Sequence, residues 1–337
     1  MKNILICPSC KHTLSEEYPE RGYLMCPGCG IDYLIQRGIP DFTVLATGNS
    51  SMDIKQTVGG FGYQWNKSPF GHKEGSLSYS KELFFSRYKI SEDELGTMLS
   101  GKTVLDPAIG SGRVEHIFGQ YPEMIYATDL SDAIYAAKTN LGNKYTLRLF
   151  KANIFNLPFK DESFDVIICH ATLQHTGDAF TALQNLIAKL KSGGIIFFDV
   201  YRKPAPIRDM ADEYIRQIVS DMPEGKAWQL LKPLTELGMD LAKLNVKITV
   251  RRDIPFLGIK AGEYDIQRFI YYYLLKLFWN DGCDFEDNHL VNFDWYYPKI
   301  AKKYTKDEVR QWVSVLQLDI MKYAATEGGI GVIAVKS

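Results

Sequence analysis

Apolar and polar positions between residues 102 and 202 predict strands separated by helices. Five apolar runs predict buried strands: "KTVLDPA", "MIYATDL", "YTLRLFKAN", "FDVIICHA" and "GIIFFDVYR". Helical spacing occurs between them in "GRVEHIFGQ", "SDAIYAAKTNL" and "DAFTALQNLIAKLKSGG". Ser131 suits the N-cap of the second helix, and Gly193 and Gly194 suit the end of the third. This alternation predicts an α/β fold with a parallel, doubly wound sheet.

The pattern changes after residue 202. Residues 203–300 predict mainly helix, with Ile207, Met210, Tyr214, Ile218 and Met222 on one stripe. The chain then closes with a helix, "TKDEVRQWVSVL", and two strands, "LDIMKYAAT" and "GGIGVIAVKS", whose short glycine-bearing connection suits a hairpin. We therefore expect a Rossmann-like seven-stranded sheet with an antiparallel C-terminal hairpin and a helical insertion, or lid, after strand five.

The N-terminal hundred residues are organised differently. Residues 1–45 hold two cysteine pairs and short turns, residues 46–60 are polar and glycine-rich like a linker, and residues 61–100 hold aromatic and helical material. The predicted units are a zinc ribbon (1–45), a linker with a lead-in that covers the cofactor (46–100), a core (101–202 and 301–337) and an acceptor lid (203–300).

Composition narrows the functional class. The 337 residues carry a net charge of −1 and a pI near 6.6, so no overall basic field favours nucleic acid. The most apolar segment, residues 269–280, is too short to span a bilayer and contains Lys276. We find no signal-peptide pattern at the start and expect a cytoplasmic enzyme.

Four of the six cysteines have the spacing of a metal site. Cys7 and Cys10 form one Cys-x-x-Cys pair, and Cys26 and Cys29 form another fifteen residues later. Four thiolates complete a tetrahedral zinc shell with no position left for water, so the predicted Zn²⁺ is structural. Disulfides, which a reducing compartment disfavours, and a redox pair are the alternatives.

The cysteine segment also resembles a known family. "CPSCKHTL…CPGCGIDYLIQRGIPDF" is similar to a small zinc-ribbon family with a Y-x-I-x-x-G-I-P signature, matched here at Tyr33, Ile35 and Gly38-Ile39-Pro40. That family is often linked to methyltransferases. The alternative role of these residues is to pack the ribbon.

A glycine turn and two polar strand ends predict a ligand site. Asp106 precedes the turn that contains Gly110 and Gly112, which lacks the third glycine of a dinucleotide fingerprint. An acidic residue at the position of Asp106 suits an ammonium group. Asp129, at the end of the second strand, suits the two hydroxyls of a ribose. Asn153, at the end of the third strand, suits the edge of an adenine. In that order the three groups describe S-adenosylmethionine. Turn capping is the alternative role for each residue alone.

Residues 102–202 resemble the class I S-adenosylmethionine-dependent methyltransferases. The pattern D-x-G-x-G-x-G is matched at Asp106, Gly110 and Gly112, with Ala108 departing, and "NLPFKDESFDVIICHATLQH" is similar to a further family run. A negative φ at Ala108 makes the departure nearly neutral, whereas a positive φ costs about 1 kcal/mol. The resemblance implies this set of cofactor-binding residues: Tyr63, Gln64, Trp65, Asp106, Ala108, Gly110, Gly112, Asp129, Leu130, Asn153, Ile154 and His170.

The acceptor is less defined by the sequence. His170 and His175 follow strand four and are the general-base candidates, and Asp199 and Tyr201 after strand five are further pocket candidates. For His175 the alternative is a structural role, because the family keeps a histidine there in members of varied chemistry. The aromatic segment 293–298, "FDWYYP", is expected at the pocket mouth.

Two groups of acceptors and one non-catalytic interpretation remain open. "DPAIGSG" is similar to the turn of adenine N6 DNA methyltransferases, but "CHATLQH" stands where they need N/D-P-P-Y/F. The aromatic insertion favours an enclosed pocket for a small-molecule or sugar-type acceptor. RNA or protein methylation with the ribbon as docking element, and a non-catalytic cofactor-binding scaffold, are the alternatives. Dimerisation through the insertion is a further expectation.

Overall fold

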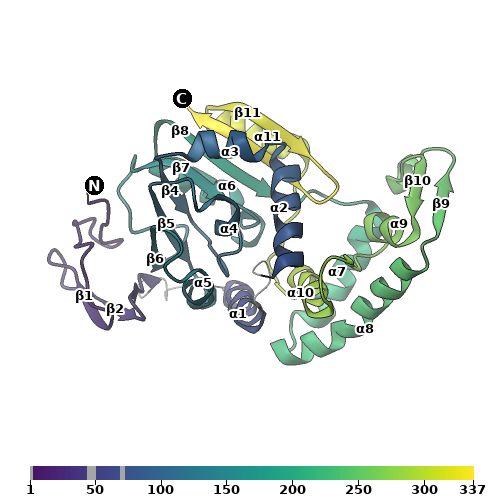
Figure 1. The fold of residues 1–337 in the computed structure, drawn as a ribbon, viewed down its shortest axis with the longest axis horizontal. Coiled ribbons are helices and arrows are strands. Elements are labelled where there is room, and N and C mark those ends of the chain that lie inside the picture. The colour runs from purple at the N-terminus through teal and green to yellow at the C-terminus, as the bar shows by residue number, and fades with distance from the viewer. Residues whose placement is uncertain (1–2, 44–50, 69–72) are drawn as a thin grey trace.

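The computed structural model describes residues 3–43, 51–68 and 73–337. Its centre is a seven-stranded sheet with the order β11-β12-β8-β7-β4-β5-β6 (Figure 1). The strands are β4 (Thr103–Asp106), β5 (Met124–Asp129), β6 (Leu147–Lys151), β7 (Phe164–Cys169), β8 (Leu190–Val200), β11 (Leu318–Ala325) and β12 (Ile330–Lys336). The first five run parallel, and β12 pairs antiparallel with both β8 and β11. The predicted doubly wound fold with an antiparallel C-terminal hairpin is confirmed.

Helices cover both faces of this sheet. One face packs against α6 (Ala179–Lys189) and α11 (Lys306–Val315). The other packs against α2 (Glu74–Tyr88), α3 (Glu92–Leu99), α4 (Glu115–Phe118) and α5 (Ala133–Leu141). Burial on both faces explains why strands such as β5 read as continuous apolar runs, because every residue of β5 is buried.

Two helix ends differ from the sequence prediction. Helix α6 ends at Lys189, and Gly193 and Gly194 belong to β8, because the strand pairs with β7 from Leu190 onward. Helix α5 has Asp132 at its N-cap, and the Ser131 hydroxyl instead donates to Asp129 and accepts from the Ala133 N–H. Sheet pairing and a nearby carboxylate therefore override the local signals for helix ends.

Helix α1 (Met52–Lys67) replaces most of the predicted linker. Residues 52–60 of that segment are helical, and residues 46–50 lie outside the described part of the chain. Its glycines allow close packing: a Cβ on Gly60 would lie 2.7 Å from the ring of Tyr297, and one on Gly62 would lie 3.5 Å from the Asp132 nitrogen. The glycine-rich composition therefore reflects helix contacts.

The N-terminal residues form a small three-stranded sheet of β1 (Gly22–Met25), β2 (Asp32–Gln36) and β3 (Ile39–Pro40). It lies beside the β6 edge of the large sheet (Figure 1), where the Phe42 N–H donates to the Lys151 carbonyl at 2.8 Å. Leu5, Tyr33 and Phe42 share one apolar cluster with Phe150 and Phe159 of the core. The cysteine-bearing segment is thus packed continuously onto the methyltransferase-like sheet.

The segment between β8 and α11 is mainly helical, as predicted, and projects on the opposite side of the sheet from the N-terminal segment (Figure 1). It contains α7 (Pro206–Val219), α8 (Glu224–Lys243), α9 (Ile266–Tyr273) and α10 (Phe285–Tyr296). It also contains an antiparallel hairpin that the sequence did not predict, formed by β9 (Lys247–Val250) and β10 (Gly262–Asp265). The short strands are only partly buried, so their apolar pattern is weak.

Helix α7 buries its charged face and exposes its apolar stripe. Met210 and Tyr214 are 70% and 66% exposed, whereas Arg208, Asp212 and Arg216 are buried. The Asp212 carboxylate accepts from Trp295 Nε1 and the Tyr296 hydroxyl at 2.9 Å each, and Arg216 donates to the carbonyls of Trp295 and Pro298. Burial of these charges is tolerated because their hydrogen bonds are satisfied inside the protein.

Candidate functional site

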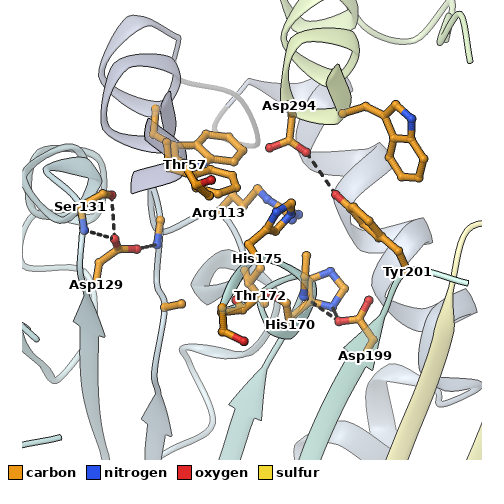
Figure 2. A pocket seen from close by; sticks show the side chains of 18 of the residues that line it. Thr57, Arg113, Asp129, Ser131, His170, Thr172, His175, Asp199, Tyr201 and Asp294 are labelled. Carbon is orange, nitrogen blue, oxygen red and sulfur yellow. Dashed lines mark hydrogen bonds and ion pairs between the residues drawn. The ribbon is translucent and has the colours of Figure 1, made fainter. Parts of the chain in front are cut away.

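A cavity of about 300 Å³ lies where the carboxyl ends of the parallel strands meet the helical insertion. Its floor is formed by the turns after β4, β5 and β6, and its other walls come from α1, α2, α7 and α10. Figure 2 shows Asp129 and Ser131 on one side of the cavity, Tyr201 and Asp294 on the other, and His175 between them. The point where the strand order reverses, between β4 and β7, is where α/β sheets bind ligands.

Asp106 ends β4 at the cavity floor, and its Oδ1 accepts from the Ala108 N–H at 2.9 Å. Burial raises the pKa of Asp106 to about 6. Glu115, also fully buried, has its pKa raised well above the usual range by burial and by the neighbouring Asp106 carboxylate. The ionised form of Asp106 is therefore stabilised by a positively charged ligand group that enters the cavity.

The departure at Ala108 is nearly neutral. Positive φ angles occur at Gly110 (58°) and Gly112 (83°), and Ala108 is outside that region. Gly110 lines the cavity, whereas Gly112 does not, and a Cβ on Gly112 would lie 2.7 Å from Leu141. The turn therefore uses its two glycines where the backbone requires them, and the extra methyl of Ala108 adds no backbone strain.

Asp129 ends β5 and organises the adjacent turns. Its Oδ1 accepts from both the N–H and the hydroxyl of Ser131 at 2.7 Å, and its Oδ2 accepts from the Gly110 N–H at 2.9 Å. Burial raises its pKa. A carboxylate has about four lone-pair positions, so one position on Oδ2 remains for a ligand hydroxyl.

The turn after β6 adds the third predicted group. Asn153, Ile154 and Leu130 all line the cavity. The Asn153 Oδ1 accepts from the Phe155 N–H at 3.0 Å, which leaves the amide Nδ2 as a donor for a ligand. The residues predicted after the first three strands are therefore brought together on one floor.

Tyr63, Gln64 and Trp65, which were predicted to bind the cofactor, point in different directions because they are consecutive residues of helix α1. Trp65 lines the cavity, whereas Tyr63 packs against Trp228 and Phe293, and Gln64 donates to Asp294 Oδ1 at 2.6 Å. The face of α1 that lines the cavity has helical spacing: Ile54, Thr57, Val58, Phe61 and Trp65. Tyr63 and Gln64 lie off this face, so of the three residues only Trp65 lines this cavity.

His170 follows β7 and belongs to a buried network. Its Nδ1 lies 3.2 Å from both the Tyr88 hydroxyl and the Asp199 carboxylate, and Asp199 also pairs with Arg87 at 2.6 Å. Burial lowers the pKa of His170, and the nearby His170 and Arg87 hold the pKa of Asp199 well below its usual range although burial opposes this. The backbone here is strained, because Ala171 has φ 56° while its N–H donates to Asp199.

His175 ends the 3₁₀ helix Leu173–His175 and also lines the cavity. Its Nδ1 lies 2.6 Å from the Ile300 carbonyl, an acceptor that places the proton on Nδ1 and the lone pair on Nε2. Phe61 and Tyr201 contact the ring edge-on, and burial lowers its pKa to about 4. The imidazole is thus neutral at ordinary pH and has a defined tautomer.

Several cavity residues were not singled out from the sequence. Asp294 and Trp295 come from the segment 293–298 that was expected at the pocket mouth, but Arg87, Arg113, Arg208 and Lys276 were not predicted. Single basic residues on helices usually face solvent, so no sequence signal marked them. Their position in the cavity depends on how the insertion packs.

The four cysteines of the N-terminal segment converge. Their Sγ atoms all lie within 4.8 Å of one another, with Cys7 and Cys29 at 3.7 Å and Cys10 and Cys26 at 3.5 Å. The Tyr33 hydroxyl lies 2.9 Å from the Cys7 Sγ. Four sulfur donors this close together fit a tetrahedral metal ion such as Zn²⁺, and a tyrosine hydroxyl can donate to a ligating thiolate.

Comparison with known proteins agrees with this division of the chain. Residues 105–198 match the model of a methyltransferase domain, and residues 2–38 match that of Trm112p-like proteins. The chain thus contains a segment similar to methyltransferase domains and an N-terminal segment similar to Trm112p-like proteins, and the second segment carries the four-cysteine cluster.

Individual relatives cover part of the chain. A ubiquinone/menaquinone biosynthesis C-methyltransferase of Shewanella baltica is 29% identical over 158 residues, 44% of this chain and 61% of the relative. A ubiquinone biosynthesis O-methyltransferase of Coxiella burnetii is 26% identical over 119 residues, 35% of this chain and 50% of the relative. Among solved structures, a methyltransferase of Aquifex aeolicus aligns with a TM-score of 0.41 at 11% identity, over 76% of this chain and 93% of that one. This chain thus spans about half to three fifths of the two curated relatives.

Within residues 3–43, 51–68 and 73–337, no helix combines the length and apolar character that a membrane crossing requires.

Proposed function

We propose that this protein transfers the methyl group of S-adenosylmethionine to a small-molecule acceptor enclosed between the sheet edge and the helical insertion. The observation that supports this most is one cavity lined both by the floor residues Asp106, Asp129 and Asn153 and by the insertion residues Asp294 and Trp295. The relatives named as quinone-biosynthesis methyltransferases, which act on small molecules, agree with it.

The floor residues fit the cofactor by donor and acceptor type. Asp106 would face the ammonium group, the remaining position of Asp129 Oδ2 would accept from the ribose, and the Asn153 amide would meet the adenine edge. When bound, S-adenosylmethionine supplies an activated methyl group, so positioning of the acceptor provides much of the catalysis.

We assign the general-base role to His175 when the acceptor is a hydroxyl or an acidic carbon. Its Nε2 has no hydrogen bond to any described residue and belongs to a side chain that lines the cavity. The Nε2 of His170 is buried and has no hydrogen-bond partner among the described residues, and its Nδ1 lies within reach of Tyr88 and Asp199. His170 is therefore assigned the role of positioning the strand end.

Two measurements test the enzyme proposal. Calorimetry should show that the full chain binds S-adenosylmethionine, and tritiated cofactor should label a compound in a small-molecule extract. Label recovered in RNA or in protein instead would favour the alternative in which the N-terminal domain docks a macromolecular substrate. Cofactor binding without label in any fraction would favour a non-catalytic scaffold, and no cofactor binding would contradict the whole proposal.

The N-terminal cluster is proposed to bind a structural Zn²⁺ through Cys7, Cys10, Cys26 and Cys29. Free thiols persist most readily in a reducing compartment, which supports a cytoplasmic location. Metal analysis should find about one zinc per chain, and Cys26→Ser should lower both the zinc content and the melting temperature. Cys283→Ser, a buried cysteine outside the cluster, is the matched control. Full zinc content in Cys26→Ser would contradict the assignment.

We also propose that the insertion mediates a homodimer. Ile207, Met210, Tyr214 and Ile218 form an exposed apolar stripe along α7, and contiguous apolar surface commonly marks an interaction site. Light scattering should give a dimer mass, and Met210→Glu combined with Tyr214→Glu should give a monomer. A monomeric mass for the unaltered chain would contradict the proposal.

A further inference from the structure

Lys276 places a buried amine at the insertion end of the cavity, and burial lowers its pKa. Its side chain lines the cavity, and the residue is 7% exposed. The backbone around it is fixed, because its N–H donates to Asp212 and its carbonyl accepts from the Tyr296 hydroxyl at 2.7 Å. Its Nζ lies 3.9 Å from the centroid of the Trp295 ring and forms no ion pair with any described residue. A buried ammonium without a carboxylate is rare in proteins.

The carboxylates of Asp212 and Asp294 accept hydrogen bonds from donors other than the Lys276 amine. Asp212 accepts from Arg208 Nε and Trp295 Nε1 on Oδ2, and from the Tyr296 hydroxyl and the Lys276 N–H on Oδ1. These four bonds fill the lone-pair positions of a carboxylate. Asp294 accepts from Gln64 at 2.6 Å and lies 3.5 Å from the Tyr201 hydroxyl. Neither carboxylate comes within 4.0 Å of the Lys276 Nζ.

A second cation with donors to spare lies beside Lys276. Arg208 uses its Nε for Asp212, and its two terminal nitrogens have no hydrogen bond to any described residue. Its guanidinium lies 4.8 Å from the ring centroid of Tyr271 and 5.2 Å from that of Trp295. Arg208, Lys276, Tyr271 and Trp295 all line the cavity, so two cations share one aromatic-walled end.

We propose that Lys276 and Arg208 form a subsite for a carboxylate group on the methyl acceptor. A carboxylate takes hydrogen bonds from an ammonium and a guanidinium together, and its charge offsets the positive excess at this end. The apolar body of the acceptor would lie against Tyr271 and Trp295, which directs its other end toward His175 and the cofactor floor. This subsite rests on the proposed methyltransferase function and narrows the acceptor to aromatic or similarly apolar carboxylic acids.

The test uses the full chain loaded with S-adenosylhomocysteine and measures the binding of three matched probes: benzoate, benzamide and phenyl phosphate. We expect benzoate to bind in the millimolar range or tighter, and tenfold or more tighter than benzamide. Lys276→Met should weaken benzoate binding at least tenfold, and Lys276→Arg, which keeps the charge, should restore most of it. Lys226→Met removes an exposed charge from α8 of the same insertion and should change nothing.

Each result bears on the proposal. Equal binding of benzoate and benzamide, a preference for phenyl phosphate, no benzoate binding in the millimolar range, or unchanged benzoate binding in Lys276→Met would each overturn the carboxylate subsite. All of these outcomes leave S-adenosylhomocysteine binding intact. Failure of the unaltered chain to bind S-adenosylhomocysteine would instead contradict the methyltransferase function on which the subsite rests.

Discussion

The floor and the roof of the cavity are built in different ways. The floor comes from three turns within residues 106–154, each directly after a parallel strand, and it presents the carboxylates of Asp106 and Asp129. The roof comes from α7, the segment after α9, and α10, all in the helical insertion, and it presents Arg208, Lys276 and Asp294. The floor is thus set by the topology of the sheet, and the roof by contacts between helices that are distant in sequence.

The difference suggests separate roles for the two ends. Turns at the ends of parallel strands are fixed by the sheet, and the same arrangement can serve one cofactor in many proteins. A helical insertion can change without altering the sheet, so it is suited to determine the acceptor. Variants on the floor should therefore affect cofactor binding, and variants on the roof should affect acceptor binding alone.

The largest expected effect follows from Asp129→Ala. The substitution removes the proposed ribose acceptor and leaves the N–H groups of Gly110 and Ser131 without their partner. Losing the one charge-assisted bond to the ligand costs about 1.5–3 kcal/mol, and the turns released from Asp129 no longer hold the floor in place, so cofactor affinity should fall about a hundredfold in calorimetry. Asp294→Ala on the roof is the matched control and should bind the cofactor normally. Comparable loss in both variants would remove the distinction between floor and roof.

An intermediate effect is expected from pH. Burial raises the pKa of Asp106 from 3.8 to about 6. The ligand-free protein therefore loses stability as the pH rises through 6 and Asp106 ionises. The ammonium group of the ligand compensates for this loss. Only the ionised form attracts the ammonium, so affinity for S-adenosylhomocysteine should fall about tenfold per unit below roughly pH 6. Calorimetry between about pH 5 and 8 tests this. Asp106→Asn should lack this dependence, and tighter binding at low pH would contradict the role of Asp106.

The smallest expected effect distinguishes two neighbours on α1. Trp65 lines the cavity, so Trp65→Ala should weaken cofactor binding about tenfold through lost apolar contact. Tyr63 packs on Trp228 and Phe293, so Tyr63→Ala should lower the melting temperature and leave cofactor affinity unchanged. Reduced affinity in Tyr63→Ala, or unchanged affinity in Trp65→Ala, would show that the orientation of α1 in the ligand-bound protein differs.

Sequence reasoning predicted the sheet well because its signals are local. Apolar residues mark the strands, Asp106 and Asp129 end β4 and β5, and Asn153 lies two residues after β6. The prediction was less successful for α1, whose Gly59 and Gly60 resemble a linker until the packing of α1 against α5 and α10 is known. Tyr63 and Gln64 were predicted with Trp65 because the three are adjacent, although successive helix positions point in different directions.

Helix α7 shows most clearly that periodicity in the sequence does not predict which face of a helix is buried. Its periodicity predicts a stripe from Ile207 to Ile218, and the stripe exists, but it faces outward. Asp212 and Arg216 are buried instead because side chains and carbonyls of residues 295–299 satisfy their hydrogen bonds. Amphipathic periodicity identifies two faces of a helix, and only the partners across the interface determine which face is buried.

The sequence by itself determined the alternation of strands and helices, the class of cofactor implied by the turns after the first three strands, and the four-cysteine cluster. Each depends on residues close together in the chain or at fixed spacing. Only the tertiary structure decided the roof of the cavity, because Arg208, Lys276 and Asp294 meet through helix packing across more than eighty residues of sequence. These side chains can bind a ligand there because burial excludes water, so their charges interact strongly with a charged group of the ligand.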